Sequence, residues 1–272
     1  MVFFSKEMIS HIIEHHNKTT HFYPNWKDDD LNIVIPMAGW GSRFTKVGYK
    51  DPKPLIKIFD KPMIELVVKS LHIQANIIFI VRKEHRNQYN LDYFLKYITH
   101  NNCHIIETEK VTEGAACTVL LAENLINNDK QLLIVNSDQY IKWDSINFMY
   151  KNISNPLLDG SILTFEDNSN KWSYVRLNDQ NLVEEVREKE VISNKATVGI
   201  YYWKKGKDFV KYAKQMIEKN IRVNNEFYVA PVYNEAIQDG KHIFTYDVEE
   251  MWGLGTPEDL EYFLKHKSYE DL

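Results

Sequence analysis

The sequence has few of the features that mark secreted, metal-clustered or membrane proteins. Cys103 and Cys117 are its only cysteines, and they form no Cys-x-x-Cys pair. Two cysteines cannot build a disulfide framework or a cysteine-based zinc site, so we expect a reducing compartment. Residues 1–30 contain no apolar run long enough for a signal peptide, and none approaches the roughly 20 residues that span a bilayer. These absences predict a cytoplasmic protein without a membrane partner.

A large excess of charge of one sign is also missing. The 272 residues carry a formal net charge of -5, with 44% hydrophobic and 26% charged residues. This composition is ordinary for a globular chain long enough for one α/β domain, and it gives no general argument for binding nucleic acid. No internal repeat or low-complexity tract interrupts it. A local basic pocket for a phosphate stays open, so we expect a small-molecule partner.

One short pattern near the start of the chain has the spelling of a metal site. His11, Glu14 and His15 follow the inverted zinc-protease motif, in which two histidines on one helical face hold a metal. No third ligand in a matching context follows. A short amphipathic helix is the favoured interpretation because apolar residues recur at Phe3, Met8, Ile12 and Ile13.

The pattern of the chain changes after a polar stretch. Residues 24–30 end in three aspartates and are interpreted as a linker, so we expect an extension at 1–30 and a domain at 31–272. Strands are predicted at 31–36, 77–81, 104–107 and 132–135, and helices at 63–71, 89–98 and 115–125. Buried strands that alternate with amphipathic helices predict an α/β fold with a mostly parallel sheet covered on both faces. Ligands of such sheets bind beyond the carboxyl ends of the strands.

The second half of the domain differs from the first. It is predicted to hold strands at 161–165, 172–177, 182–186 and 197–203, helices at 207–219 and 227–237, a strand at 243–246 and a closing helix from Pro257. Short strands with turn residues between them indicate a small β-rich region, which we interpret as a substrate-binding region.

The clearest functional signal is the loop after the first predicted strand. Residues 37–44 read MAGWGSRF, and DPKP follows at 51–54. Gly39 and Gly41 allow a tight turn in which backbone amides can face an anion. Arg43 and Lys53 add two cations, and the prolines on either side of Lys53 restrict its backbone. This combination predicts a loop that binds a triphosphate.

Two familiar phosphate loops do not fit this segment. Phe44 stands where the dinucleotide fingerprint has its third glycine, and no Gly-Lys-Ser/Thr follows as in a P-loop. An acidic residue at the end of the second strand, which a nicotinamide-dependent oxidoreductase needs, is not clear either. The oxidoreductase therefore stays a disfavoured alternative.

Taken together, the motifs identify a family resemblance. The loop at 37–44, with PKPLI at 52–56 and KPMI at 61–64, resembles the opening of the sugar-phosphate nucleotidylyltransferases, the family that includes glucose-1-phosphate thymidylyltransferase. The similarity extends over residues 31–264. It implies a Rossmann-like three-layer α/β/α nucleotidyltransferase core. It also implies a reaction in which a nucleoside triphosphate is joined to a sugar 1-phosphate and pyrophosphate is released.

The resemblance assigns nucleotide-binding roles to two segments. The residues that would surround the triphosphate are Ala38, Gly39, Gly41 and Ser42. The residues that would contact the nucleobase are Thr112, Glu113 and Gly114. Arg43 would meet the β- and γ-phosphates, and Lys53 would neutralise charge around the reacting phosphate. The alternative for the second segment is a plain loop in which Thr112 caps the following helix.

Metal and acceptor roles follow from the same resemblance. Asp138, at the end of the fourth predicted strand, matches the aspartate that holds Mg²⁺, a cation that prefers carboxylate and phosphate oxygens. Glu188 and Lys189 would hold the sugar hydroxyls and the acceptor phosphate, although the charged run around them is also typical of a solvated hairpin edge. Gly199 and Glu226 stand where relatives line the sugar pocket, and both are compatible with a purely structural role.

One position departs from the family pattern. Gly253 stands where relatives commonly have a second metal-binding aspartate. Asp247, Glu249 and Glu250 are close in sequence and are the candidates to replace it. A one-carboxylate magnesium site and a catalytically inactive nucleotide sensor are the other interpretations.

The expected chemistry needs no protein nucleophile. A phosphate oxygen of the acceptor can attack the α-phosphorus in line, so positioning and charge neutralisation would carry catalysis. By resemblance we expect a pyrimidine triphosphate and a sugar 1-phosphate, with a product used for surface polysaccharide. Phosphocholine or a phosphorylated amino-acid derivative is the alternative acceptor, with a cytidylyl group as the alternative donor. A homo-oligomer stays open.

Overall fold

The computed structural model describes residues 26–271, which form one central sheet, two small ribbons and the helices around them. The strands are β1 (Trp26–Pro36), β2 (Lys57–Ile58), β3 (Lys61–Pro62), β4 (Ile73–Arg82), β5 (Cys103–Thr108), β6 (Gln131–Val135), β7 (Gln139–Lys142), β8 (Gly160–Glu166), β9 (Ser173–Leu177), β10 (Val183–Glu188), β11 (Lys195–Trp203), β12 (Ile243–Asp247) and β13 (Glu250–Gly253). The helices are α2 (Ser42–Lys46), α3 (Met63–Ser70), α4 (Lys83–Gln88), α5 (Leu91–Ile98), α6 (Ala115–Leu120), α7 (Glu123–Ile126), α8 (Ser145–Ser154), α9 (Gly206–Glu218), α10 (Val232–Gln238) and α11 (Pro257–His266), with 3-10 turns η1 (Lys53–Leu55) and η2 (Tyr269–Asp271).

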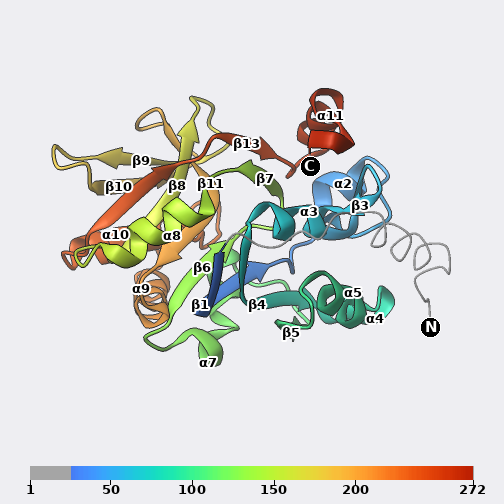
Figure 1. Ribbon diagram of the computed structural model, residues 1–272, viewed down its shortest axis with the longest axis horizontal. Helices are drawn as coiled ribbons and strands as arrows, with labels where there is room; N and C mark the ends of the chain where they lie inside the picture. Colours follow the sequence, from blue (N-terminus) through green and yellow to red (C-terminus); the bar gives the residue numbers. More distant parts are fainter. Residues whose placement is uncertain (1–25, 272) are drawn as a thin grey trace.

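The central sheet has nine strands, and its main path runs β10-β9-β11-β6-β1-β4-β5 (Figure 1). The strands β6, β1, β4 and β5 are mutually parallel, as their alternation with helices predicts. From β11 onward the antiparallel second half extends the same sheet, because β11 pairs antiparallel with β6, β8 and β9. The β-rich region is therefore continuous with the parallel core.

Helices cover both faces of this sheet. On one face α3, α5 and α8 pack over Ile33 and Ile35 of β1. On the other face α6, α9 and α10 pack over Val34 of β1 and Ile78 of β4. Successive side chains of a strand point to opposite faces, so a continuous apolar strand feeds two cores at once. The predicted α/β/α layering is confirmed.

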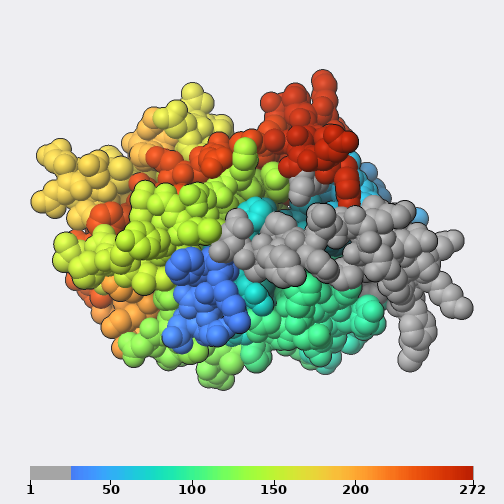
Figure 2. Space-filling view, viewed as in Figure 1, coloured from blue at the N-terminus to red at the C-terminus, as the bar shows by residue number. Residues whose placement is uncertain are grey.

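A third apolar cluster joins the two ends of the described chain. Phe44 of α2 and Met63 of α3 pack with Leu254 and with Leu260 and Phe263 of α11. Figure 1 shows α11 next to α2 and α3, and Figure 2 shows the C-terminal segment in red along one edge of the molecule. The pairing of β13 with β7 guides the chain there. The turn before α11 therefore meets the segment that follows β6.

Several predicted boundaries differ from the structure. β1 begins at Trp26, so the predicted linker is wrong over 26–30. Trp26 and Lys27 already pair with β4, and the pairing continues from Asn32 after a register shift. The helix predicted at 89–98 begins two residues later, as α5, because Asn90 before it adopts a left-handed conformation with φ 48°. The short helix α4 at Lys83–Gln88 was not predicted. The division into an extension and a domain stays a prediction, and the zinc-like spelling at His11 lies outside the described residues. Within 26–271 no helix has both the length and the apolarity that a membrane crossing requires.

Candidate functional site

The glycine loop brings two distant parts of the opening motif into contact. Gly41 has φ +62°, and a Cβ built on it would lie 3.1 Å from Cβ of Lys53. A side chain there would be strained by the positive φ and would crowd Lys53, so glycine is favoured on both counts. At Gly39 a Cβ would meet no atom within 4 Å, which leaves its backbone open to a ligand. Ala38 is buried just before it, and Ser42 and Arg43 begin α2 at the surface.

Lys53 and Asp138 form an ion pair at this loop. Lys53 Nζ donates a hydrogen bond to Asp138 Oδ2 at 2.7 Å, and the two side chains are only 22% and 26% exposed. Lys53 begins η1, whereas Asp138 follows β6, the strand beside β1. Their attraction is stronger than that of a surface pair, because the surrounding protein screens charge less than water does. The structure thus joins two of the predicted catalytic residues.

Two glycines from later in the chain, Gly199 of β11 and Gly255 of the turn before α11, fit closely around the turn that carries Asp138. A Cβ on Gly199 would lie 2.4 Å from Nδ2 of Asn136, and Asn136 N donates to the Gly199 carbonyl at 2.9 Å. A Cβ on Gly255 would lie 2.9 Å from Asp138 Oδ2, and Leu254 N donates to the Asp138 carbonyl at 2.8 Å. Gly199, predicted for the sugar pocket, therefore shapes the base of the aspartate turn.

The donor set around Asp138 suits a magnesium ion that arrives with phosphates. Within residues 26–271 no group of three or more His, Cys, Asp or Glu side chains could hold a metal by itself. One carboxylate beside a phosphate-binding loop still fits Mg²⁺, which commonly takes one or two carboxylates, substrate phosphates and waters. Asp138 is the residue that would hold it.

The candidates to replace the missing second aspartate are engaged elsewhere. Asp247 pairs with Lys195, Glu249 with Lys142 and Glu250 with Lys267. A Cβ on Gly253 would lie 3.0 Å from the Trp172 ring and 3.7 Å from the Asp259 carboxylate, which pairs with Lys171. That one of these three acids replaces the missing metal-binding aspartate stays a prediction, and none of the contacts they make supports it.

The segment predicted to read the nucleobase is bonded to a second loop. Gly114 has φ +129°, and a Cβ on it would lie 2.5 Å from the backbone of Phe227. Phe227 N donates to the Glu113 carbonyl at 2.8 Å, and the Glu113 carboxylate pairs with Arg222. The hydroxyl of Thr112 donates to the Gly114 carbonyl at 2.9 Å, and α6 has Gly114 at its N-cap, so the alternative of a Thr112 cap is wrong.

The residues predicted to hold the acceptor, Glu188 and Lys189, lie at the end of β10. Ser173 Oγ of β9 donates to a carboxylate oxygen of Glu188, and burial raises the pKa of Glu188 despite the opposing effects of Ser173 and Lys189. Lys189 Nζ donates to the Tyr228 hydroxyl at 2.9 Å. Lys189 itself has φ +58°, a conformation that is costly for a residue with a side chain. A solvated hairpin edge does not describe this pair, because both side chains have specific partners.

Tyr228 is a member of this cluster that sequence reasoning missed. Burial raises its pKa well above the usual range, Glu226 raises it further, and the charge of Arg43 lowers it. Tyr228 thus lies among Arg43 of α2, Glu226 and Lys189, which come from three parts of the chain. The only signal in the sequence was its place two residues after Glu226, where an aromatic residue is equally typical of a core.

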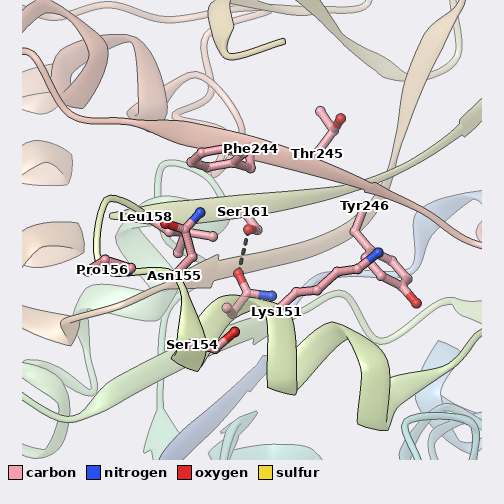
Figure 3. Close-up of a pocket in the computed structure, with 10 residues that line it drawn as sticks. Lys151, Ser154, Asn155, Pro156, Leu158, Ser161, Phe244, Thr245 and Tyr246 are labelled. Carbon is pink, nitrogen blue, oxygen red and sulfur yellow. Dashed lines mark hydrogen bonds between the residues drawn. The ribbon is translucent and has the colours of Figure 1, made fainter. Parts of the chain in front are cut away.

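A separate pocket of about 480 Å³ lies between α8 and β12 (Figure 3). Its lining includes Lys151, Asn155, Leu158, Phe244 and Tyr246, and Lys151 Nζ lies 5.4 Å from the centre of the Tyr246 ring. It contains none of the predicted site residues. The candidate site is therefore the loop cluster at the carboxyl ends of β1 and β6.

Comparison with known proteins gives matches over most of the domain. The family model described as nucleotidyl transferase matches residues 33–267. A curated protein of Methanococcus vannielii, "Bifunctional protein GlmU", is 26% identical over 250 residues, which cover 87% of this chain and 56% of that protein. "Mannose-1-phosphate guanyltransferase" of Schizosaccharomyces pombe is 23% identical over 237 residues, covering 84% and 62%. The chain spans about half the length of the first of these relatives.

Solved structures share the fold. A nucleoside-diphosphate-sugar pyrophosphorylase from Vibrio cholerae superimposes with a TM-score of 0.73 at 25% identity, covering 86% of this chain and 100% of that one. A putative glucose-1-phosphate thymidylyltransferase from Bacillus anthracis gives 0.69 at 19% identity, covering 88% and 97%. At these levels of identity the arrangement of strands and helices is what the chains have in common.

Proposed function

The chain belongs to the nucleotidyl transferase family, and on that premise we propose that it transfers a nucleotidyl group from a nucleoside triphosphate to a phosphorylated small molecule, most favourably a sugar 1-phosphate. One observation carries the proposal. The Lys53–Asp138 ion pair, with a distance of 2.7 Å, lies against an open glycine loop at the carboxyl edge of the sheet. A cation, a carboxylate and bare amides at one edge suit a triphosphate with its metal.

The chain's own residues would act through charge and position. Amides of the loop at Gly39 would face the phosphates, and Arg43 and Lys53 would stabilise the negative charge that develops on the departing pyrophosphate. Lys189, held toward Tyr228, would bind the acceptor phosphate, which otherwise repels the triphosphate. The acceptor oxygen forms the new bond to the α-phosphorus as the bond to pyrophosphate breaks, so no protein nucleophile is needed.

Mg²⁺ held at Asp138 would supply additional charge neutralisation on the phosphates when bound. The resemblance favours a pyrimidine nucleotide, whereas the curated relatives include a guanyltransferase, so the base is tested rather than assumed. A surface polysaccharide is the proposed destination of the product. The proposed site of the reaction is the cytoplasm, and a homo-oligomer is compatible with it.

The direct test is pyrophosphate release in the presence of Mg²⁺. Five triphosphates (ATP, GTP, CTP, UTP and dTTP) are scanned against sugar 1-phosphates, phosphocholine and phosphorylated amino-acid derivatives. Release that requires one base and one sugar 1-phosphate supports the proposal. Release with CTP and phosphocholine replaces it with the cytidylyltransferase alternative, and binding of a triphosphate without release for any acceptor contradicts the transferase and favours a sensor.

A further inference from the structure

The glycine loop carries a large aromatic side chain that faces solvent. Trp40 stands between Gly39 and Gly41 and is 62% exposed, whereas Phe44 of the following helix is 1% exposed and anchors the loop in an apolar cluster. An indole ring on the surface exposes a broad apolar face that water solvates poorly. A ligand that covers this face would bury it at a place where phosphates are also expected.

One side of the Trp40 ring is already occupied. The guanidinium carbon of Arg82 lies 3.9 Å from the ring centre, and the Arg82 side chain is 10% exposed. Arg82 Nη2 donates to Glu84 at 2.9 Å, while its Nε is buried and has no hydrogen-bond partner within residues 26–271. A planar guanidinium stacks flat on an aromatic face, whereas a lysine ammonium contacts it only as a compact point charge. Arg82 therefore supports one face of the indole and favours the orientation in which the ring lies against it.

The strand order places this pair relative to the reacting groups. Arg82 is the last residue of β4, and β4 lies next to β1, whose carboxyl end leads to Trp40. Asp138 follows β6, which lies on the other side of β1. Arg82 and Asp138 thus lie at the ends of the strands on opposite sides of β1, with the glycine loop and Trp40 at the end of β1 between them. A ligand with phosphates at the loop and a flat group at one end would contact both.

We propose that Trp40, oriented by Arg82, is a stacking surface for the nucleobase of the triphosphate. This inference rests on the proposed function and names the group that holds the base. Stacking of bases on aromatic rings is tolerant of sequence because every base has a π-face, so the pair contributes affinity and leaves the choice of base to other groups. The base would lie against the free face of Trp40, and its phosphates would run along the loop toward Lys53.

The test compares binding of two anions that differ in the base. The full chain and its Trp40→Ala and Trp40→Phe variants are titrated by calorimetry with inorganic tripolyphosphate and with whichever of ATP, GTP, CTP, UTP and dTTP the parent binds most tightly, all with Mg²⁺. Trp40→Ala should weaken binding of the nucleoside triphosphate about 5-fold to 100-fold and leave tripolyphosphate unchanged within about 2-fold. Trp40→Phe should retain most of the affinity because it retains an aromatic face.

Two further variants separate stacking from other effects. Arg82→Lys, which retains the charge and removes the planar support, should weaken only the nucleoside triphosphate, by a smaller factor than Trp40→Ala. Tyr150→Ala is the matched control, because this aromatic residue on α8 is 64% exposed and lies outside the loop. It should bind both anions as the parent does.

The outcomes distinguish a failure of the base-stacking role of Trp40 from a failure of the proposed transferase function. Equal nucleotide affinity in Trp40→Ala and the parent would overturn the base-stacking role of Trp40 and leave the proposed function unaffected. Equal losses for both anions would also overturn it, because the damage would then be to the phosphate loop. If the parent binds tripolyphosphate but no nucleoside triphosphate, the base-stacking role is wrong, and if it binds neither, the proposed function fails with it.

Discussion

The proposed nucleotide side and the proposed acceptor side of the candidate site are built in different ways. On the nucleotide side the backbone of left-handed Gly41 leaves little room for a Cβ beside Lys53, and Lys53 then forms an ion pair with Asp138. On the acceptor side Lys189 and Tyr228 meet through side chains, from the end of β10 and the loop after α9. Backbone geometry is hard to alter without disturbing the fold, whereas side-chain contacts can be exchanged one at a time. Acceptor binding should therefore be separable from nucleotide binding.

The largest expected effect falls on the nucleotide side. Asp138→Asn should lower the rate of pyrophosphate release by about 100-fold to 1,000-fold, as loss of one electrostatic group commonly does. Lys53→Gln should act similarly, and the double variant should be little worse than the poorer single variant because the two residues form one ion pair. Single-turnover rates of the four proteins test this. Independent, multiplying losses would contradict a shared role.

The next effect falls on the acceptor side and separates charge from backbone strain. Lys189→Ala removes the ammonium group but retains φ +58°, whereas Lys189→Gly removes both the charge and the strain. Both should raise the KM for the acceptor about 10-fold to 100-fold, because a charge-assisted hydrogen bond is lost. Only the glycine variant should relieve the left-handed penalty, by about 1 kcal/mol relative to the alanine variant in urea unfolding.

The KM for the triphosphate serves as the control for these two proteins. It should stay within about 2-fold of the parent if the two sides are separable. A matching rise in the KM for the triphosphate would contradict this separation and show that one network of contacts spans both sides of the site.

A smaller effect is expected when the backbone of the loop is changed. Gly41→Ala should lower the free energy of unfolding by about 1 to 2 kcal/mol, because alanine disfavours φ +62° and its Cβ would approach Lys53 at 3.1 Å. Gly39→Ala is the matched control, since its Cβ would meet no atom within 4 Å, and its stability should change by less than about 0.5 kcal/mol. Denaturant titration of both variants decides, and equal losses would contradict the special role of Gly41.

The smallest expected effect concerns pH on the acceptor side. Burial raises the pKa of Glu188 above its ordinary value of 4.5, so the folded chain binds this proton more tightly than the unfolded chain. The stability that protonated Glu188 contributes is complete below 4.5 and is lost as pH rises through the raised pKa. Glu188→Gln is neutral throughout, so it should gain stability relative to the parent between pH 4 and pH 7. The measurement is the free energy of unfolding of both proteins as a function of pH. If the difference between them does not change over this range, the buried carboxyl is not its source.

The sequence by itself determined the parallel core and located the glycine loop that we propose binds the triphosphate. Short apolar runs with β-branched residues, such as 31–36, are typical of strands buried on both faces, and the glycine, arginine and lysine of the loop motif lie within one short stretch, so local pattern was sufficient. The same local reasoning misplaced the start of β1, because Trp26 and Lys27 join the sheet through backbone pairing with β4 that side-chain pattern does not report.

Only the tertiary structure decided which distant residues share the site. The contact of Gly255 with Asp138, the pairing of Gly114 with Phe227 and the stack of Trp40 on Arg82 join positions that belong to different strands and loops. None of these contacts has a sequence signature, because each depends on strand order and crossover. The physical reason is that propensity and periodicity act over a few neighbouring residues, whereas a binding site forms where the packing of the whole sheet brings its carboxyl ends together.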